Sequence, residues 1–471
     1  MSSFAALNGA YTSLTAQRIA LEATGQNISN VNTPGYTRQR VSLEAITGGT
    51  QPTMTGTARG IGVRVTSIDR LGDVFLETKL RAQTASASRL DAMAGSWRLL
   101  ETSVQEPGEK GLASTFDTFF AAWQDVANRP DDTAAKAVLL GNAHAAVDGI
   151  ADGYRAAESQ WNATREQASA IADDVNTTAA AVADLNARIR DARVSGVPAN
   201  ELVDQRGLLL VSLSSLVGGE VRERADGTVD VMVGGNALVR GDDAYAVAVH
   251  GTSALDGLTN LGTEPAGGWG SHEGPARLVW AASGDSTGAT GGRLTGLVES
   301  LAADGPFAGM ASSYNTLATT LAAEVNALHS SQPGHDGVTR DFFSFGTVAS
   351  PALALEVAIT DVSELVTGVP GEIDGSIAAG ISKLTGARDV WSGAVVDLGV
   401  NTRAAIRRAE AAESTRVIAE SQLLSQTAVD LDEESVNLVM YQRAYEAAAR
   451  VLTTVDEMLD TLINRTGVVG R

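Results

Sequence analysis

The chain closes on the stretch ESVNLVMYQRAYEAAARVLTTVDEMLDTLINR, residues 434 to 465, which predicts one long amphipathic helix. Its apolar positions alternate by three and four residues without a slip, and such a 3.5-residue repeat predicts a stripe that faces one partner along the whole helix. At about 1.5 Å per residue the stripe would be roughly 36 Å long. The stripe consists of Leu438, Tyr441, Tyr445, Ala448, Leu452, Val455, Leu459 and Leu462.

The first helix, residues 4 to 28, carries a second stripe of the same kind, made of Phe4, Leu7, Tyr11, Leu14, Leu21 and Ile28. Both helices could simply pack into one globular core, which is the usual fate of an amphipathic helix. That interpretation does not explain why both stripes lie at the ends of the chain, where chains normally fray. We therefore expect the two terminal helices to lie together and to serve assembly with other chains.

The composition excludes several partners and chemistries. The chain has 471 residues, enough for more than one domain, and 35 basic against 56 acidic residues give a net charge of −21. This acidity argues against nucleic acid or an anionic membrane as the main partner. Without cysteine, the chain has no disulfide and no zinc–cysteine site. The first residues lack the pattern of a cleavable secretory signal and no run is long enough to span a bilayer, so we expect any export to use a route that reads no such signal.

Between the two ends, the longest regular pattern predicts a coiled-coil-like strut of roughly 60 Å. Asp131 or Asp132 supplies its expected N-cap, and Gly196 with Pro198 ends it. The seam of this strut consists of Val147, Ile150, Tyr154, Ala157, Trp161, Thr164, Ala168, Ile171, Val175, Thr178, Val182, Leu185 and Ile189.

Alternation with period two predicts strands within residues 59–70, at Thr228–Val233 and Ala244–Val249 in a Gly-rich segment, and at Ala354–Ile359. The predicted fold class is α+β, multidomain and elongated, with long coiled-coil-like helices from both chain ends and an inserted small β domain. We divide the chain into three parts. Residues 1–40 with 436–471 form the paired terminal helices, 41–205 with 293–435 a helical rod domain with short strands, and 206–292 an inserted β-rich outer domain.

Sites for chemistry are few. Gly284 to Gly288 matches the G-x-S-x-G pattern of a serine hydrolase with Ser286 as nucleophile, but a loop follows where that motif needs a helix. His329, His335 and Asp336 could touch a metal, although a solvated loop is the favoured interpretation. We therefore expect no enzyme activity, no catalytic or metal-binding residue and no cofactor.

Residues 27 to 40, NISNVNTPGYTRQR, resemble the signature of the bacterial flagellar axial proteins, the family of rod, hook and hook-associated subunits. The C-terminal run NLVMYQRAY (437–445) and the internal segments LVDQRGLLLVSLSSLVGGEV (202–221), EVNALH (324–329) and DFFSF (341–345) are similar to the hook-associated branch. The residues that match the family motif are Asn27, Asn30, Asn32, Pro34, Gly35, Tyr36, Arg38, Gln39 and Gln442.

This resemblance implies a structural adaptor of the bacterial flagellum that joins hook to filament. The terminal helices would be the innermost layer of a tubular helical assembly, a coiled coil that lines the export channel, with the β domain outside, where it would decouple a flexible hook from a stiff filament. The alternative within the family is a hook or distal-rod subunit, against which the Tyr36 to Gln39 ending and the long strut argue.

The resemblance also implies the partners. These would be copies of the chain in a helical ring, the hook protein, and a second hook–filament junction protein with flagellin and its cap beyond it. A cytoplasmic export chaperone would cover the C-terminal helix. The subunit would leave the cytoplasm through the flagellar type III secretion apparatus and act outside the cell.

Overall fold

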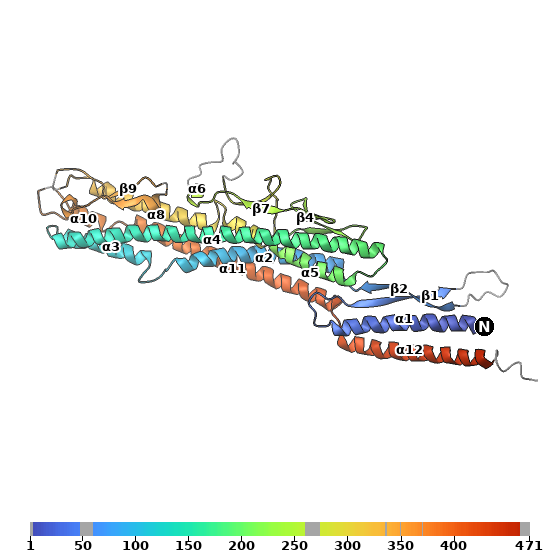
Figure 1. The fold of residues 1–471 in the computed structure, drawn as a ribbon. Coiled ribbons are helices and arrows are strands. Elements are labelled where there is room, and N and C mark those ends of the chain that lie inside the picture. The colour runs from blue at the N-terminus through green and yellow to red at the C-terminus, as the bar shows by residue number, and fades with distance from the viewer. Residues whose placement is uncertain are drawn as a thin grey trace, which may run out of the picture.

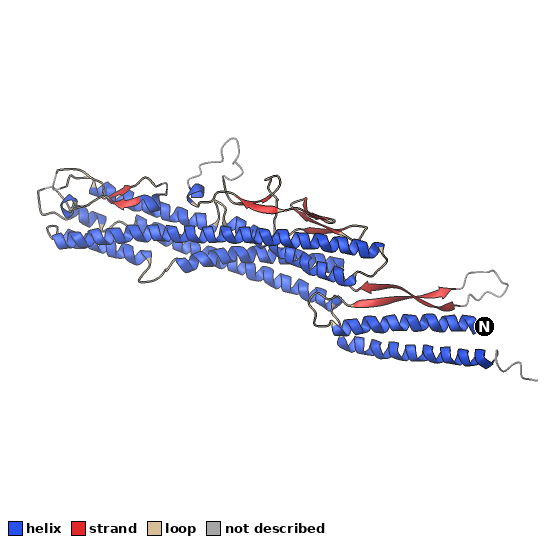
Figure 2. Cartoon of the chain, in the orientation of Figure 1, coloured by secondary structure: helices blue, strands red, loops and turns tan. Residues whose placement is uncertain are grey.

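The computed structural model describes residues 3–47, 60–259, 274–334, 337–348, 350–369 and 371–461. Helices dominate, and they form a long rod with both chain ends extending from one end of it (Figures 1 and 2). In the described part of the chain, no helix is both long and apolar enough to cross a membrane.

The strut is helix α4, Thr133–Val194, which runs for 62 residues. It begins where a cap is available, because the Asp132 carboxylate accepts hydrogen bonds from the backbone N–H groups of Ala134 and Ala135. The predicted seam is confirmed: its members are buried from Val147 to Ile189, except for Thr178, which is half-buried.

Other helices pack around this strut. α3 (Leu112–Asn128), α5 (Asn200–Val217) and α8 (Pro306–His329) contact α4 directly. α2 (Val74–Ser103) pairs with α11 (Gly386–Thr427) along their length and packs against the short helix α7 (Arg293–Ser300).

The end of the rod remote from the termini is closed by an aromatic cluster. Phe119 of α3 packs against Phe342 and Phe343, and Trp123 packs against Phe342, with ring centroids 5.2 to 6.2 Å apart. Around them lie β9 (Phe343–Phe345), α9 (Pro351–Ala354), β10 (Leu355–Val357), the 3-10 turn η1 (Val362–Glu364) and α10 (Ser376–Ile381).

His329 belongs to this cluster, so the expectation that it lies on a solvated loop is wrong. It is completely buried at the end of α8, where Nδ1 lies 2.9 Å from the carbonyl oxygen of Arg340 and Nε2 accepts a hydrogen bond from the N–H of Val366. Desolvation lowers the pKa of His329, which keeps the ring neutral. The other two residues of that metal alternative, His335 and Asp336, lie outside the described residues.

The β-rich segment contains two small antiparallel sheets. The first has the order β3-β4-β5-β6, formed by Glu220–Glu223, Val229–Val233, Asn236–Arg240 and Asp243–Ala244. The second pairs β7 (Val247–His250) with β8 (Arg277–Trp280), and the short helix α6 (Asp256–Thr259) lies between them in the chain. The segment begins later than expected, because residues 206–217 still belong to α5.

The single strand predicted at Ala244–Val249 is wrong. The chain leaves the first sheet after Ala244 and enters the second at Val247. The change of partner occurs at the intervening residues: the N–H of Tyr245 donates to Leu238 of the first sheet, while the carbonyl of Ala246 accepts from Ala281, just beyond β8.

Two asparagines of α4 fix these sheets on the strut. The Asn176 amide exchanges two hydrogen bonds with the backbone of Val247, at 2.8 and 3.0 Å. The completely buried Asn186 amide bonds the N–H and C=O of Val229 and the C=O of Gly241. Because each amide replaces a missing strand neighbour, the sheets lie firmly on α4.

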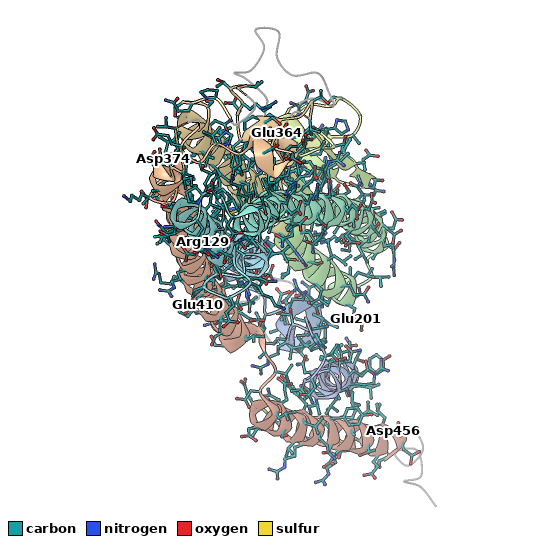
Figure 3. The ribbon with its side chains drawn as sticks, turned by 90° about the vertical axis from the view of Figure 1, so that its left-hand side faces the viewer. Arg129, Glu201, Glu364, Asp374, Glu410 and Asp456 are labelled. Atoms are coloured by element: carbon teal, nitrogen blue, oxygen red, sulfur yellow. The ribbon has the colours of Figure 1, made fainter. Side chains whose placement is uncertain are left out.

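At the opposite end, α1 (Ser3–Ser29) lies between α12 (Leu431–Asp460) and the hairpin of β1 (Gln39–Thr47) and β2 (Gly60–Arg70) (Figure 1). Seen end-on, α1 and α12 lie below the rod, with Asp456 of α12 on the side of the molecule away from Glu364 (Figure 3).

Candidate functional site

The polar run after α1 lies where the rod meets the terminal helices, and we call this junction the articulation. Helix α1 ends at Ser29, and a turn through Thr33 and Pro34 leads to Gly35, whose φ of +76° favours glycine. A Cβ at Gly35 would collide with the Leu208 side chain of α5. The turn therefore packs directly on the rod.

Asn27 is the centre of the articulation. Its side-chain amide donates to the carbonyl oxygen of Gln39 at 2.8 Å and to Glu434 at 3.2 Å. Its side-chain oxygen accepts from the N–H of Gln39 and from the Tyr36 hydroxyl, both at 2.9 Å. Asn27 is 1% exposed, so these bonds satisfy a buried amide and join α1 to the start of β1 and of α12.

Arg38 completes the link to α12, and we call Asn27, Arg38, Glu433 and Glu434 the clasp. The guanidinium donates to both oxygens of Glu433 at 2.7 and 2.9 Å and to Glu434 at 2.7 Å. The hydrogen bond to Glu433 raises the pKa of Arg38 and lowers that of Glu433. Glu434 is 2% exposed, so its charge depends on Arg38 and on the amide of Asn27.

A second set of bonds ties the articulation to the rod. Asp204 of α5 accepts from Arg70 at 2.7 Å and from the N–H of Thr37 at 3.2 Å. Asn200 donates to the Gln39 side chain at 3.1 Å, and the N–H of Arg38 donates to the carbonyl of Thr427, the last residue of α11. Burial raises the pKa of Tyr36 to about 12, and the nearby Asp204 adds to the shift.

The break between α11 and α12 spans only residues 428 to 430. Asp430 caps α12 by accepting bonds from the N–H groups of Asp432 and Glu433, and the first turn of α12 is acidic. The direction in which α12 leaves the rod is thus set by this cap and by the clasp.

The terminal helices α1 and α12 are in contact, but the buried hydrophobic residues of α1 are smaller than we predicted. The buried hydrophobic residues of α1 are Ala10, Ala16, Ala20 and Ala23. The hairpin packs so tightly that a Cβ at Gly62 would collide with Thr12. Because α1 is held between α12 and the hairpin, alanines occupy its buried hydrophobic positions, whereas its leucines are half-buried.

Most predicted stripe residues are only partly buried. Val455 and Ala448 are buried, whereas Leu7, Leu14, Leu21, Ile28, Leu438, Tyr441, Leu452 and Leu459 are half-buried. Tyr11 is 64% exposed and Tyr445 38% exposed. The side chain of Phe4 and residue Leu462 lie outside what the structure describes.

The motif residues divide in the same way. Asn27 and Gln39 are buried and Tyr36 and Arg38 half-buried at the articulation, with Asn30 half-buried at the end of α1. Asn32, Pro34, Gly35 and Gln442 are exposed. The sequence analysis did not single out Glu433, Glu434, Arg70 or Asp204. The acidic first turn of α12 is visible in the sequence and could have drawn attention to Glu433 and Glu434. Nothing in the sequence, however, pairs this turn with Arg38.

Ser286 does not form a nucleophile elbow. Its exposed hydroxyl accepts a hydrogen bond from the N–H of Gly288 at 3.4 Å. The next helix, α7, begins only at Arg293, whereas the elbow needs a helix directly after the serine. The described residues also contain no group of three metal-ligating side chains.

A long helical rod whose terminal helices lie together at one end, joined there by the clasp, has the architecture of a structural protein. Comparison with known proteins names its family. Residues 98–343 match the model of the flagellar hook-associated protein FlgK helical domain. Residues 7–37 match that of the flagella basal body rod protein, and 420–465 that of the C-terminal part of the flagellar basal body rod FlgEFG proteins. The chain belongs to the family of flagellar hook-associated proteins, FlgK.

The names of two relatives from sequence comparison agree with this family. The chain is 29% identical to flagellar hook-associated protein 1 of Bacillus subtilis over the full length of both. It is 32% identical to the protein of the same name from Escherichia coli, over 61% of this chain and 51% of that one. The solved flagellar hook junction protein FlgK of Burkholderia pseudomallei aligns with a TM-score of 0.47 at 23% identity, over 57% of this chain and 47% of that one.

Proposed function

We propose that this protein is a structural adaptor that joins the hook of a bacterial flagellum to its filament, and that it acts outside the cell without catalysis. The observation that carries the proposal is the contact between residues 3–29 and 431–460 at one end of a long rod, in a chain of the hook-associated family. Its neighbours would be copies of itself, the hook protein and a second junction protein with flagellin and its cap beyond.

The terminal pair is proposed as the innermost layer of the assembly. Helix α12 has a second apolar stripe, which we call the outer stripe, on the face that its contact with α1 leaves exposed: Val436, Met440, Val451 and Met458 are 50 to 68% exposed. Such a stripe on a helix with one intramolecular partner fits contact with neighbouring copies, since heterologous contacts that do not close build helical arrays.

The remaining layers follow from the same arrangement. Residues 41–205 with 293–435 would form the next layer and the β-rich segment within 206–292 the outer one. The sequence suggested that the β-rich segment decouples hook from filament. Its attachment to α4 through Asn176 and Asn186 argues against that role.

Before assembly, the outer stripe would need a cover, which fits a cytoplasmic export chaperone on α12 and passage through the flagellar type III apparatus. Amide exchange of the purified chain, alone and mixed with a candidate export chaperone from the same cells, tests this: protection confined to α12 is expected, and protection confined to the rod would contradict it.

The adaptor function is tested by deleting the gene in the organism that carries it. Cells are expected to assemble hooks without filaments and to release flagellin into the medium, and the wild-type gene should restore filaments. Normal filaments in the deletion strain would overturn the proposal.

A further inference from the structure

A cavity of about 410 Å³, which we call the junction cavity, opens beside the articulation. Its walls come from the turn after α1, from α2, from α5 and from the end of α11. Its apolar walls are Leu80, Leu208, Val211 and Leu423, and its polar edge includes Tyr36, Arg70 and Arg81. We propose that the ring of Phe75 from a second copy of this chain fills this cavity, an inference that rests on the proposed assembly of copies side by side.

The charges in the cavity favour a neutral aromatic occupant. Arg70 pairs with Asp204 at 2.7 Å and approaches Glu77 at 3.7 Å, and Arg81 approaches Glu77 at 3.6 Å. Since these carboxylates already neutralise the two guanidinium groups, an anion that entered the cavity would find no unpaired cation to bind. An aromatic ring against aliphatic walls, with a guanidinium over its face, gains both apolar burial and a cation–π interaction.

The chain presents such a ring at the same height. Phe75 is 75% exposed, the highest value among the large apolar side chains of α2, and its neighbour Val74 is 59% exposed. Glu77, Leu80 and Arg81, two to six residues later on the same helix, line the cavity, so ring and cavity lie within roughly 9 Å along the axis.

Phe75 also projects from a different side of α2. With 3.6 residues per turn it lies about 140° around the helix from Leu80 and about 120° from Arg81. A projection on one flank and a cavity at the same height on another suit a heterologous contact between copies around a common axis.

The other exposed aromatic residues of the described chain are poorly placed for this contact. Tyr11 and Tyr445 lie along the terminal helices, Tyr245 lies in the β-rich segment and Phe345 lies at the remote end of the rod. The contact would therefore place each ring beside the neighbour's clasp and help to hold the angle between the rod and the terminal pair.

The absence of cysteine from the chain gives a direct test. In flagella assembled from the double variant Phe75→Cys/Leu208→Cys, mild oxidation is expected to produce a ladder of disulfide-linked multimers. Leu208 is 45% exposed at the cavity, so the new thiol is reachable. The matched control is Leu99→Cys/Leu208→Cys, because Leu99 is also an exposed residue of α2 but lies 24 positions farther along; this pair and each single variant should give no ladder.

Two outcomes separate this inference from the proposed function. Junctions that contain the double variant but yield no ladder would overturn the inference and leave the adaptor function standing. Absence of the single Leu99→Cys chain, which keeps Phe75 and the cavity and is traced with a thiol label, from the flagellum would instead contradict the adaptor function.

A second test does not depend on assembly of the double variant. Phe75→Ala should leave the monomer's melting temperature unchanged because the ring is exposed, and should lower the number of filaments that survive shear by about tenfold or more. Phe75→Trp should keep most filaments. Unchanged shear resistance in Phe75→Ala would overturn the inference.

Discussion

Glu434 and Glu433 are adjacent acidic residues that share one arginine, yet their surroundings differ. The side chain of Glu434 is 3% exposed and that of Glu433 57%. Replacing Glu434 leaves Arg38 and the buried Asn27 amide with fewer acceptors, whereas replacing Glu433 removes a partner that water can substitute.

We therefore predict that Glu434→Ala lowers the local free energy of opening of α12 by about 2–4 kcal/mol. The matched control, Glu433→Ala, should cost less than about 1 kcal/mol, because exposed ion pairs contribute little. Amide exchange of α12 measures both. Equal effects of the two substitutions would contradict the assignment of Glu434 as the buried member of the clasp.

His329 gives a pH dependence at the remote end of the rod. Burial lowers its pKa below the ordinary value of 6.5, with Asp341 as the nearby acid that opposes the shift. Below pH 6.5 the unfolded chain therefore binds a proton that the folded one does not, so stability falls as the pH falls toward the lower folded-state pKa. Above pH 6.5 this contribution is fully present.

The expected loss is at most about 1.4 kcal/mol for each pH unit of that window. Urea unfolding at pH 7.5 and 5.5, followed by the fluorescence of Trp123 and its neighbours, measures it. The non-titrating variant His329→Gln should be less stable at both pH values but should lose less between them. The same loss in both proteins would show that other groups cause it.

At the scale of the elements, α4 fixes the β-rich segment through Asn186. The Asn186 side chain bonds three backbone groups of the sheet, and its oxygen also accepts a hydrogen bond from Arg206 at 2.9 Å. Burial lowers the pKa of Arg206 to about 10. Asn186→Ala leaves several buried groups without partners, so we expect a loss of about 2–4 kcal/mol. Asn162→Ala on the exposed face of α4 is the control and should change stability by less than about 0.5 kcal/mol.

Circular dichroism during thermal unfolding, with amide exchange of β4, checks this prediction. Faster exchange in β4 for Asn186→Ala alone is the expected pattern. A stable β4 in that variant would mean that the sheet holds its place without the strut.

The two faces of α12 make separable predictions. Leu452→Asp puts a charge at the contact with α1, so it should free α12 from α1 while the rod stays folded, and should abolish assembly. Val451→Asp puts the same charge on the outer stripe, so the α1–α12 contact should persist in the monomer while assembly is still lost.

Amide exchange of the monomer and filament counts on complemented cells distinguish the two variants. Normal filament attachment with Leu452→Asp would refute the role of the paired helices, and normal attachment with Val451→Asp would refute the role of the outer stripe.

At the scale of the whole molecule, the sequence was most informative where structure depends on neighbours in the chain. The seam of α4 and the cap at Asp132 are local, and both were predictable. The clasp was not, because Arg38 and Glu434 are 396 residues apart and only the fold brings them together. The break after Ala244 was hidden because alternation continues through it, although the hydrogen-bond partners change.

The terminal helices show the same limit. The stripe of large residues was visible, but the burial of Ala16 and Ala20 depends on α1 having a helix on one side and a hairpin on the other. Pairing of distant segments, and with it the size of residue that fits between them, is a property of the whole fold.

The central claim is that the paired terminal helices build this chain into the flagellum between hook and filament. Electron cryo-microscopy of flagella from cells that carry the gene tests it most directly. We expect a short segment of these subunits at the junction, with α1 and α12 innermost around the channel and the β-rich segment outside. A junction without this chain, or one in which α1 and α12 face outward, would contradict it.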